Sequence, residues 1–302
     1  MPAQKPATPF DLDDPAAYRR WRDGKLAAQP QSLDELRVEI RQPADPHSEE
    51  IESVRRICRH TNWVLYRVGN PREMTEETLK LLGERLGLRH VDRNLCAEDS
   101  GVTAVTTRAR PGKPYIPYTN RPLSWHTDGY YNDTAHQIRG WILHCVQDAA
   151  DGGDNEILDH ELLYIHLRDR DPALVAALME PDAMTIPANE DGGRELRPDH
   201  SGPVFSVDST GNLHMRYSAR KRNIVWKDRP GTRAAAEAIK TLLSDTSAPI
   251  SRYRLRPGEG IVSNNVLHRR DGFTDNPAAG KKRLFLRARY YDRIAASGHD
   301  EN

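Results

Sequence analysis

The sequence has few cysteines, no excess of either charge and no long apolar run, and each absence excludes a class of protein. Its 3 cysteines, Cys58, Cys96 and Cys145, lie far apart without a C-x-x-C pair, which argues against a disulfide framework and a cysteine-rich zinc site. Because 44 Lys and Arg balance 44 Asp and Glu, there is no basic footprint for nucleic acid or an anionic membrane. No stretch approaches the ~18 apolar residues of a membrane span. We therefore expect a cytoplasmic protein that binds neither nucleic acid nor membrane.

Apolar residues are nevertheless frequent enough to build a core. They make up 37% of the 302 residues, and this length suits one large domain or two small ones. Residues 1–46 are rich in Pro, Asp, Arg and Gln, with an aromatic cluster around Tyr18 and Trp21. We predict that this segment is an N-terminal extension laid over a domain of residues 47–302. The sequence does not decide the oligomeric state, and a homo-oligomer is compatible with it.

The domain is predicted to open with a helix, a strand and a second helix. Ser48 can cap a helix whose apolar residues repeat every three or four positions. Residues 63–66 are typical of a buried strand, and a second amphipathic helix runs from Thr75 to a stop at Gly87.

After residue 100 the pattern changes to short strands with a few inserted helices. Gly, Pro and Asn/Asp clusters separate the strands, and neither βαβ alternation nor a fixed repeat is present. This favours a mainly β fold with flanking helices, either an antiparallel barrel or a sandwich, and a double-stranded β-helix (jelly roll) is one member of that class. The predicted strands cover 102–107, 140–146, 204–207, 213–217, 251–255, 261–268 and 283–291, and the helices 161–168, 172–180 and 232–244.

The tripeptide His126-Thr127-Asp128 can contribute two ligands to a metal ion. On an extended chain the imidazole and the carboxylate point to the same side, so a third ligand from elsewhere would complete one face and leave sites open for substrate and O₂. The signal is weak alone, because His90-Val91-Asp92 has the same form and two H-x-E tripeptides occur at 47–49 and 299–301.

His268 is the predicted third ligand, and the last strand supports it. Period-two alternation places Arg283, Arg287 and Arg289 on one face of residues 283–291. If that face is solvated, it is an ordinary charged surface. If it points into a barrel, the buried guanidinium groups require anions, and their planar forks suit carboxylates. A metal triad beside them would bind a metal-chelating dicarboxylate.

Together these residues resemble the Fe(II)/2-oxoglutarate-dependent dioxygenases of the taurine dioxygenase (TauD/TfdA) and γ-butyrobetaine hydroxylase group. The resemblance covers about residues 115–292, with weaker support from residue 50. Its ordered blocks are far more specific together than any one alone. They are LSWHTD (123–128), LHC (143–145) with GGDN (152–155), RY (216–217), NVLHRRDGF (265–273) and RLFL (283–286).

The resemblance implies a clavaminate synthase-like jelly roll and assigns roles to single residues. His126, Asp128 and His268 would bind Fe(II), and Arg283 would pair with the distal carboxylate of 2-oxoglutarate. Asn155 stands where the family often has a threonine that holds the same carboxylate. The implied reaction consumes O₂ and 2-oxoglutarate, releases succinate and CO₂, and hydroxylates or desaturates an unactivated C–H, since halogenating members have a small residue in place of Asp128.

Substrate recognition is predicted from the remaining arginines and the aromatic residues. The offset of Arg287 from Arg283 resembles that of the sulfonate-binding arginine in taurine dioxygenase, and Arg289 lies near a position of the γ-butyrobetaine cage. Aromatic walls suit a quaternary ammonium group and arginines suit an acid, so we expect a small anionic or zwitterionic substrate. The alternative is that the aromatic residues pack the core and the arginines pair with protein carboxylates. The candidate aromatic residues are Tyr115, Tyr118, Trp125, Tyr130 and Tyr131.

Two other functions compete with the dioxygenase. A Zn²⁺-dependent hydrolase could use the same His and Asp ligands, but no general base is evident beside them and the arginine face would be unexplained. A β-rich binding module would treat the histidines as ordinary polar residues.

Overall fold

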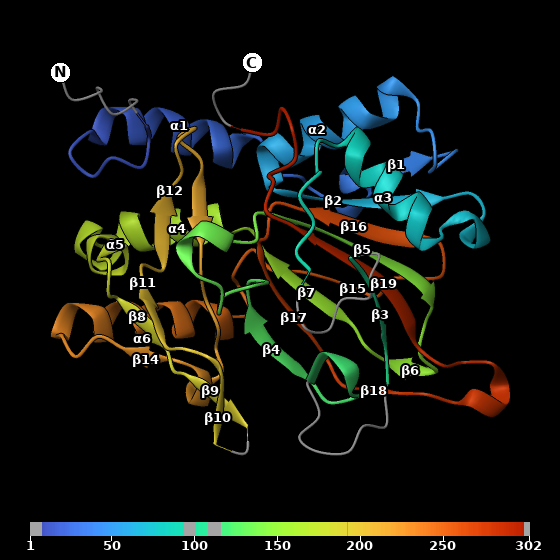
Figure 1. Ribbon diagram of the computed structural model, residues 1–302. Coiled ribbons are helices and arrows are strands. Elements are labelled where there is room, and N and C mark those ends of the chain that lie inside the picture. Colours follow the sequence, from blue (N-terminus) through green and yellow to red (C-terminus); the bar gives the residue numbers. More distant parts are fainter. Residues whose placement is uncertain (1–7, 94–100, 108–115, 192, 299–302) are drawn as a thin grey trace.

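The computed structural model describes residues 8–93, 101–107, 116–191 and 193–298, and its centre is a barrel of two facing sheets (Figure 1). The larger sheet has six strands in the order β1 (Arg37–Ile40), β2 (Trp63–Val68), β16 (Glu259–Ser263), β5 (Gly140–Gln147), β19 (Leu284–Tyr290) and β3 (Val102–Thr106). The smaller sheet has four, in the order β15 (Ser251–Tyr253), β7 (Asn155–Leu158), β17 (Leu267–Arg270) and β4 (Leu123–His126).

Side chains of the two sheets meet inside the barrel. The rings of Trp63 and Tyr253 stack with centroids 5.9 Å apart, and the ring of Trp141 lies 4.9 Å from that of His268. Within these two sheets every pair of strands is antiparallel except β1 with β2. The jelly-roll expectation is therefore confirmed.

Two helices cover the outer face of the larger sheet. The capping box of α2 (Ser48–Thr61) uses His47 as the N-cap, one residue before the predicted Ser48, and the side chain of Thr75 caps α3 (Glu76–Arg85) as predicted. Their apolar faces pack on outward side chains of the sheet and form one core with them, because alternation along each strand sends every second side chain outward.

A second helical layer covers the outer face of the smaller sheet. Its helices are α4 (His160–Arg170), α5 (Pro172–Met179) and α6 (Pro230–Ser244), which lie on the left in Figure 1. Leu158, Leu267 and Trp125 belong to this second core. Short strands fill the neighbouring segment, namely β8 (Met184–Ile186) with β11 (His200–Gly202) and β14 (Val225–Trp226), β9 (Asn189–Asp191) with β10 (Arg194–Arg197), and β12 (Phe205–Val207) with β13 (Leu213–Met215). The pair β6 (Asp151–Gly152) and β18 (Phe273–Thr274) closes one end of the barrel.

The predicted strand 261–268 is wrong as a single strand. It is two strands, β16 in the larger sheet and β17 in the smaller one, joined by a turn in which Asn265 has a φ of 57°. The apolar run hides this break, because both halves are buried and need apolar side chains. The turn moves the chain from one sheet to the other, and His268 therefore faces the strand that carries His126.

The N-terminal segment packs closely on the remainder of the chain. Phe10 and the helix α1 (Pro15–Ala27) contact α4, where the rings of Phe10 and Tyr18 lie 5.3 and 6.3 Å from that of Tyr164. Strand β1 continues the larger sheet. The division into an extension of residues 1–46 and a domain of 47–302 stays a prediction.

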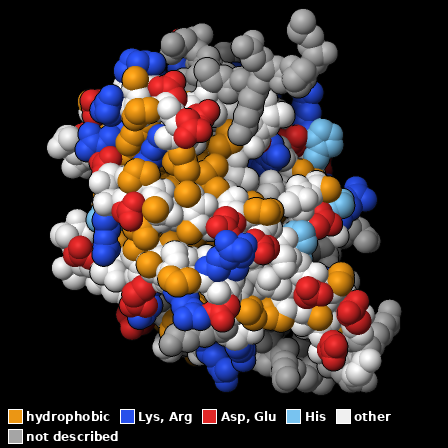
Figure 2. Space-filling model, turned by 90° about the vertical axis from the view of Figure 1, so that its left-hand side faces the viewer, with side chains coloured by type: hydrophobic (Ala, Val, Ile, Leu, Met, Phe, Trp, Pro, Cys, Tyr) orange, Lys and Arg blue, Asp and Glu red, His pale blue; other side chains and the backbone are white. Residues whose placement is uncertain are grey.

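One face of the molecule gathers hydrophobic side chains, as Figure 2 shows. A groove of about 410 Å³ lies where α1, α4 and α6 meet, and its lining residues are Leu26, Leu162, Ile165, His166, Asp169, Arg170, Leu242 and Pro249. None of the described helices is long and apolar enough to cross a membrane.

Candidate metal and cosubstrate site

The structure brings His126, Asp128 and His268 together inside the barrel. His126 ends β4 and pairs in register with His268 on β17, so their rings lie 4.3 Å apart. One ligand atom from each of the three residues lies within 4.8 Å of the others. Among the described residues this is the only such group of three or more His, Cys, Asp or Glu side chains.

Both histidines direct the same ring nitrogen, Nε2, toward the space between the three residues. Nδ1 of His126 lies 2.9 Å from the carbonyl oxygen of Ser124, and Nδ1 of His268 lies 2.9 Å from that of Val266. A carbonyl oxygen only accepts hydrogen bonds, so each Nδ1 carries the proton and each Nε2 keeps its lone pair. Burial, followed by repulsion from His126, lowers the pKa of His268 to about 3, which keeps that ring neutral and able to bind a metal.

Asn265 ties the two metal-facing segments together, a role that the sequence did not reveal. Its Oδ1 accepts a hydrogen bond from the backbone N–H of Asp128, and its Nδ2 donates to the carbonyl oxygens of Asp128 and Ile138. The available signal was an asparagine three residues before His268, because Asn tolerates the left-handed conformation found there.

Asp128 is buried but ionised. Burial alone raises the pKa of its carboxyl group, yet the positive charge of Arg287, and to a smaller extent that of Arg289, outweighs burial and holds the pKa well below its usual range. Nη1 of Arg287 lies 3.5 Å from Oδ2 of Asp128. The predicted arginine face of the last strand thus points into the barrel, although Arg287 approaches a protein carboxylate there.

Arg283 is a buried cation without a carboxylate partner among the described residues. Its side chain is 4% exposed, and its guanidinium lies 3.9 Å from the centre of the Phe285 ring and 5.2 Å from that of Phe273. Its Nε is buried without a hydrogen-bond acceptor. Burial and then the neighbouring Arg270 lower the pKa of Arg283 to about 9. A bound anion would remove this cost of burying the charge.

Asn155 lies beside the same end of the barrel. It opens β7 directly after the Gly152-Gly153 turn, and a Cβ added to Gly153 would lie 4.0 Å from Nε of Arg283. Nδ2 of Asn155 is buried and has no acceptor among the described residues. Both predicted cosubstrate residues therefore offer unpaired donors next to one turn.

Arg289 has protein partners, and its contact with substrate stays a prediction. Its guanidinium forms a buried ion pair with Asp92, and Nη1 donates to the hydroxyl of Tyr131, 2.9 Å away. Tyr291 also donates to Asp92. These contacts follow the alternative reading, in which the arginine pairs with a protein carboxylate.

The side chain of Trp125 points away from the three predicted metal ligands. It alternates with His126 on β4, so its side chain packs outward in the core of α4–α6. Tyr130 accepts a hydrogen bond from Nδ2 of Asn223, and Tyr130 and Tyr131 pack beside that same core. Their contact with substrate stays a prediction, and Tyr115 lies outside the described residues.

Two other features do not form a comparable site. His90 is 75% exposed and pairs with Asp292, while Asp92 faces Arg289, so the two side chains of the second H-x-D do not point at a common metal position.

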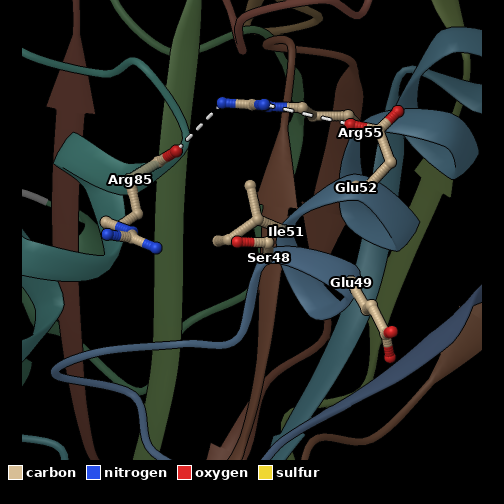
Figure 3. A pocket seen from close by; sticks show the side chains of 6 residues that line it. All are labelled: Ser48, Glu49, Ile51, Glu52, Arg55 and Arg85. Atoms are coloured by element: carbon tan, nitrogen blue, oxygen red, sulfur yellow. Dashed lines mark hydrogen bonds and ion pairs between the residues drawn. The ribbon is translucent and has the colours of Figure 1, made fainter.

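A cavity of about 490 Å³ lies on the opposite side of the larger sheet, between α2 and α3 (Figure 3). Its charged residues bind each other there, since Arg55 pairs with Glu52 and donates to the carbonyl oxygen of Arg85.

Comparison with known sequences identifies related proteins. A family model described as "Taurine catabolism dioxygenase TauD, TfdA family" matches residues 24–289. A uridine-5'-phosphate dioxygenase of Amycolatopsis sp. is 29% identical over 234 residues, which cover 66% of this chain and 82% of that protein. One of the same name from Streptomyces sp. is 29% identical over 200 residues, or 63% and 69% of the two chains.

Solved structures share the fold at low identity. An asparagine oxygenase in complex with Fe(II), 2S,3S-3-hydroxyasparagine and succinate matches with a TM-score of 0.57 at 16% identity, covering 88% of each chain. The non-heme iron oxygenase OrfP, in complex with Fe, succinate and (3S)-hydroxy-L-Arg, matches with a TM-score of 0.59 at 14% identity over 83% of this chain and 82% of that one. PvcB from Pseudomonas aeruginosa gives 0.56 at 14%, over 84% and 82%.

Proposed function

This chain belongs to the TauD/TfdA family of dioxygenases, and from that premise we propose that His126, Asp128 and His268 hold its Fe(II) while Arg283 and Asn155 bind 2-oxoglutarate. The reaction is the oxidation of an unactivated C–H in a small substrate, with consumption of O₂ and release of succinate and CO₂. When bound, the iron and its cosubstrate supply the oxidising chemistry. The protein supplies the ligands, the anion pocket and exclusion of water.

Arg283, which is buried and has no ion-pair partner among the described residues, carries this proposal. Two histidines and one carboxylate on one side of a metal, with the remaining sites open, suit Fe(II) oxygenases, but the same set could hold Zn²⁺. A Zn²⁺ hydrolase has no use for a buried guanidinium with no carboxylate partner among the described residues. A dicarboxylate that chelates the metal at one end and reaches Arg283 at the other accounts for both features.

The test is anaerobic addition of Fe(II) and 2-oxoglutarate, which should produce a visible charge-transfer band. The band should disappear in His126→Ala and His268→Ala. His90→Ala is the matched control, because His90 belongs to the other H-x-D and lies on the surface, and it should keep the band. A wild-type protein without the band, or a band that survives loss of His126 or His268, would overturn the assignment.

For the substrate we propose a small anionic molecule, and a nucleoside monophosphate is the first compound to test. Two relatives named uridine-5'-phosphate dioxygenases support this choice, since a phosphate ester is an anion. An aromatic cage for a quaternary ammonium has less support, because Trp125 packs outward and the Tyr131 hydroxyl binds Arg289. The cytoplasmic location stays a prediction.

A substrate screen should compare nucleoside monophosphates with sulfonates, phosphonates, dicarboxylates and betaines. Succinate release must be coupled to formation of an oxidised product, because uncoupled turnover also releases succinate. Coupled turnover of a betaine but of no anionic compound would contradict the anionic substrate while leaving the metal centre intact.

A further inference from the structure

We propose that Arg287 is a positioning residue for Asp128, holding the carboxylate oxygen that faces away from the two histidines. The inference rests on the proposed metal centre and deepens it. It differs from the sequence-based expectation that Arg287 binds the substrate anion, because it assigns Arg287 a role before any substrate arrives.

The two carboxylate oxygens of Asp128 have different neighbours. Oδ1 lies 3.5 Å from Nε2 of His126 and 3.8 Å from Nε2 of His268, so it faces the point where a metal would be held. Oδ2 lies 3.5 Å from Nη1 of Arg287 and is buried without a hydrogen bond within the described part of the chain. One oxygen is therefore available to the metal, and the other faces a cation.

The sheet fixes the cation in that place. Arg287 lies in the interior of β19, between Leu143 of β5 and Thr103 of β3, and its side chain is 14% exposed. In the regions that the structure describes, Asp128 is the only carboxylate within 4.0 Å of its guanidinium. Arg289, the next inward-facing arginine, is occupied by Asp92 and Tyr131. Arg287 is thus the cation that remains for Asp128.

This contact has a consequence for metal binding. With Oδ2 directed at Arg287, Asp128 offers a single oxygen, so the carboxylate does not occupy a second coordination position. Groups that hold a metal ligand from behind set its orientation, and their loss usually weakens metal affinity by about 10–100-fold. Without Arg287 the buried carboxylate of Asp128 would lose its nearest cation and the contact that directs Oδ2 away from the metal.

The test measures Fe(II) affinity by anaerobic calorimetry without 2-oxoglutarate or substrate. Arg287→Met should weaken Fe(II) binding by about 10–100-fold, and Arg287→Lys should restore most of it, because the ammonium keeps the charge at the same strand position. Arg252→Met is the matched control: Arg252 lies on β15 of the smaller sheet and pairs with Asp271 rather than Asp128, so this variant should bind Fe(II) like the wild type. Thermal unfolding of each metal-free protein identifies a variant that fails to fold. If Arg287→Met fails to fold, the Fe(II) affinities of Arg287→Lys and of a second variant, Arg287→Gln, test the inference instead.

The outcomes separate this inference from the metal centre itself. Wild-type Fe(II) affinity in Arg287→Met, with Fe(II) binding lost in His126→Ala, would overturn the role of Arg287 alone and leave the metal centre intact. Fe(II) binding that persists in His126→Ala would overturn both. An equal loss of affinity in Arg252→Met would also overturn the inference, because it would show a general effect of removing an arginine from the barrel.

Discussion

Arg283 carries a positive charge into the barrel, and the described residues give it no carboxylate. Arg283→Met keeps an unbranched apolar side chain but removes the charged guanidinium that lies against the rings of Phe273 and Phe285. We expect the affinity for 2-oxoglutarate to fall by about 100-fold, since truncating one partner of a buried charge pair costs about 2–5 kcal/mol. A 2-oxoglutarate titration of the anaerobic Fe(II) protein measures this. The ligand-free variant should be at least as stable as wild type, because it no longer buries an unpaired cation; a clear drop in its melting temperature would show that Arg283 is structural.

His144 makes the stability of the ligand-free protein depend on pH. It is fully buried on β5, where burial lowers its pKa to about 4 and its Nδ1 lies 3.0 Å from the hydroxyl of Tyr66. In the unfolded chain the pKa returns to about 6.5, so below that pH the unfolded state binds more protons and stability falls as the pH drops toward 4. This single group should cost about 2 kcal/mol between pH 7 and pH 5.

Urea unfolding of the metal-free protein at pH 7 and pH 5 measures that difference. His144→Gln should flatten the dependence by the same amount, because glutamine does not titrate and can still bond to Tyr66. An unchanged pH dependence in this variant would mean that other groups cause the loss.

At the scale of elements, the turn between β16 and β17 positions the metal site, because it joins the two sheets and carries Asn265, whose side chain hydrogen-bonds to the backbone of Asp128. Asn265→Ala removes three hydrogen bonds and replaces asparagine, which tolerates the left-handed conformation found there, with a residue that tolerates it less, at a cost of about 3 kcal/mol in the free energy of unfolding. Asn265→Gly removes the same bonds but tolerates the backbone, so it should be about 1 kcal/mol more stable than Asn265→Ala. Both should weaken Fe(II) binding. Urea unfolding measures the loss of stability and Fe(II) titration measures the loss of metal affinity. An Asn265→Gly variant with wild-type Fe(II) affinity would show that the side chain of Asn265 does not orient Asp128.

Local patterns predicted the elements that carry the chemistry. Alternation along residues 283–291 correctly placed Arg283, Arg287 and Arg289 on one face, and the H-x-D met His268 in space as expected. The turn at Asn265 escaped prediction because its flanking strands are both apolar, and only pairing across the barrel distinguishes them. Asp92, the partner of Arg289, lies 197 residues away in sequence, so no local pattern could assign it. Strand β1 was missed because its segment is polar in composition and its pairing with β2 is parallel and remote.

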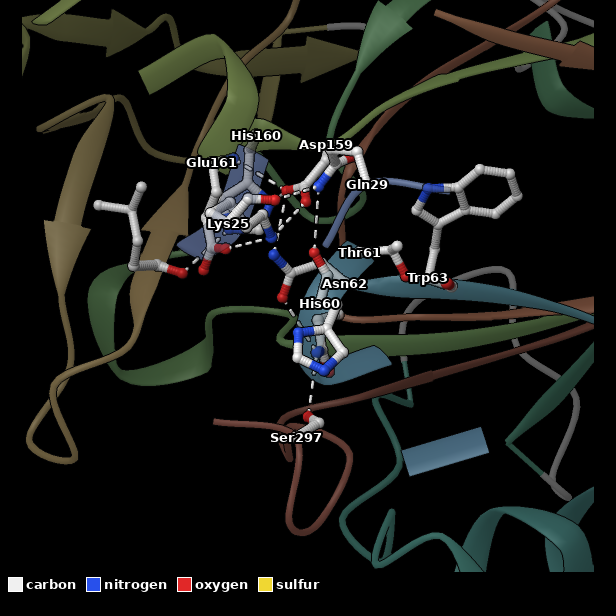
Figure 4. A network of polar contacts seen from close by, with 12 residues as sticks. Lys25, Gln29, His60, Thr61, Asn62, Trp63, Asp159, His160, Glu161 and Ser297 are labelled. Atoms are coloured by element: carbon white, nitrogen blue, oxygen red, sulfur yellow. Dashed lines mark hydrogen bonds and ion pairs between the residues drawn. The ribbon is translucent and has the colours of Figure 1, made fainter. Parts of the chain in front are cut away.

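At the scale of the whole molecule, a buried polar network connects both ends of the described chain to the barrel (Figure 4). Nζ of Lys25 on α1 lies 2.6 Å from Asp159 and 2.5 Å from Glu161 at the start of α4. Asn62, which ends α2, donates to Asp159 and accepts from Asn264 and from Arg293 near the C-terminal end. The network therefore joins five segments that are distant in sequence, and Asn264 places it next to Asn265, which holds the backbone of Asp128.

Loss of Lys25 should accordingly destabilise the whole protein. Burial raises the pKa of Glu161, but Lys25 and its neighbours outweigh this and lower the pKa to about 2, so at pH 7 Lys25→Met would leave two buried carboxylates facing each other without that cation. Breaking a buried pair from one side costs about 3–5 kcal/mol, whereas Lys240→Met, which breaks an exposed pair with Glu237, should cost less than about 1 kcal/mol. Urea unfolding at pH 7 compares them. Adding Glu161→Gln to Lys25→Met should recover part of the loss, because it removes one uncompensated charge; if Lys25→Met unfolds like Lys240→Met, α1 does not depend on this network for its position.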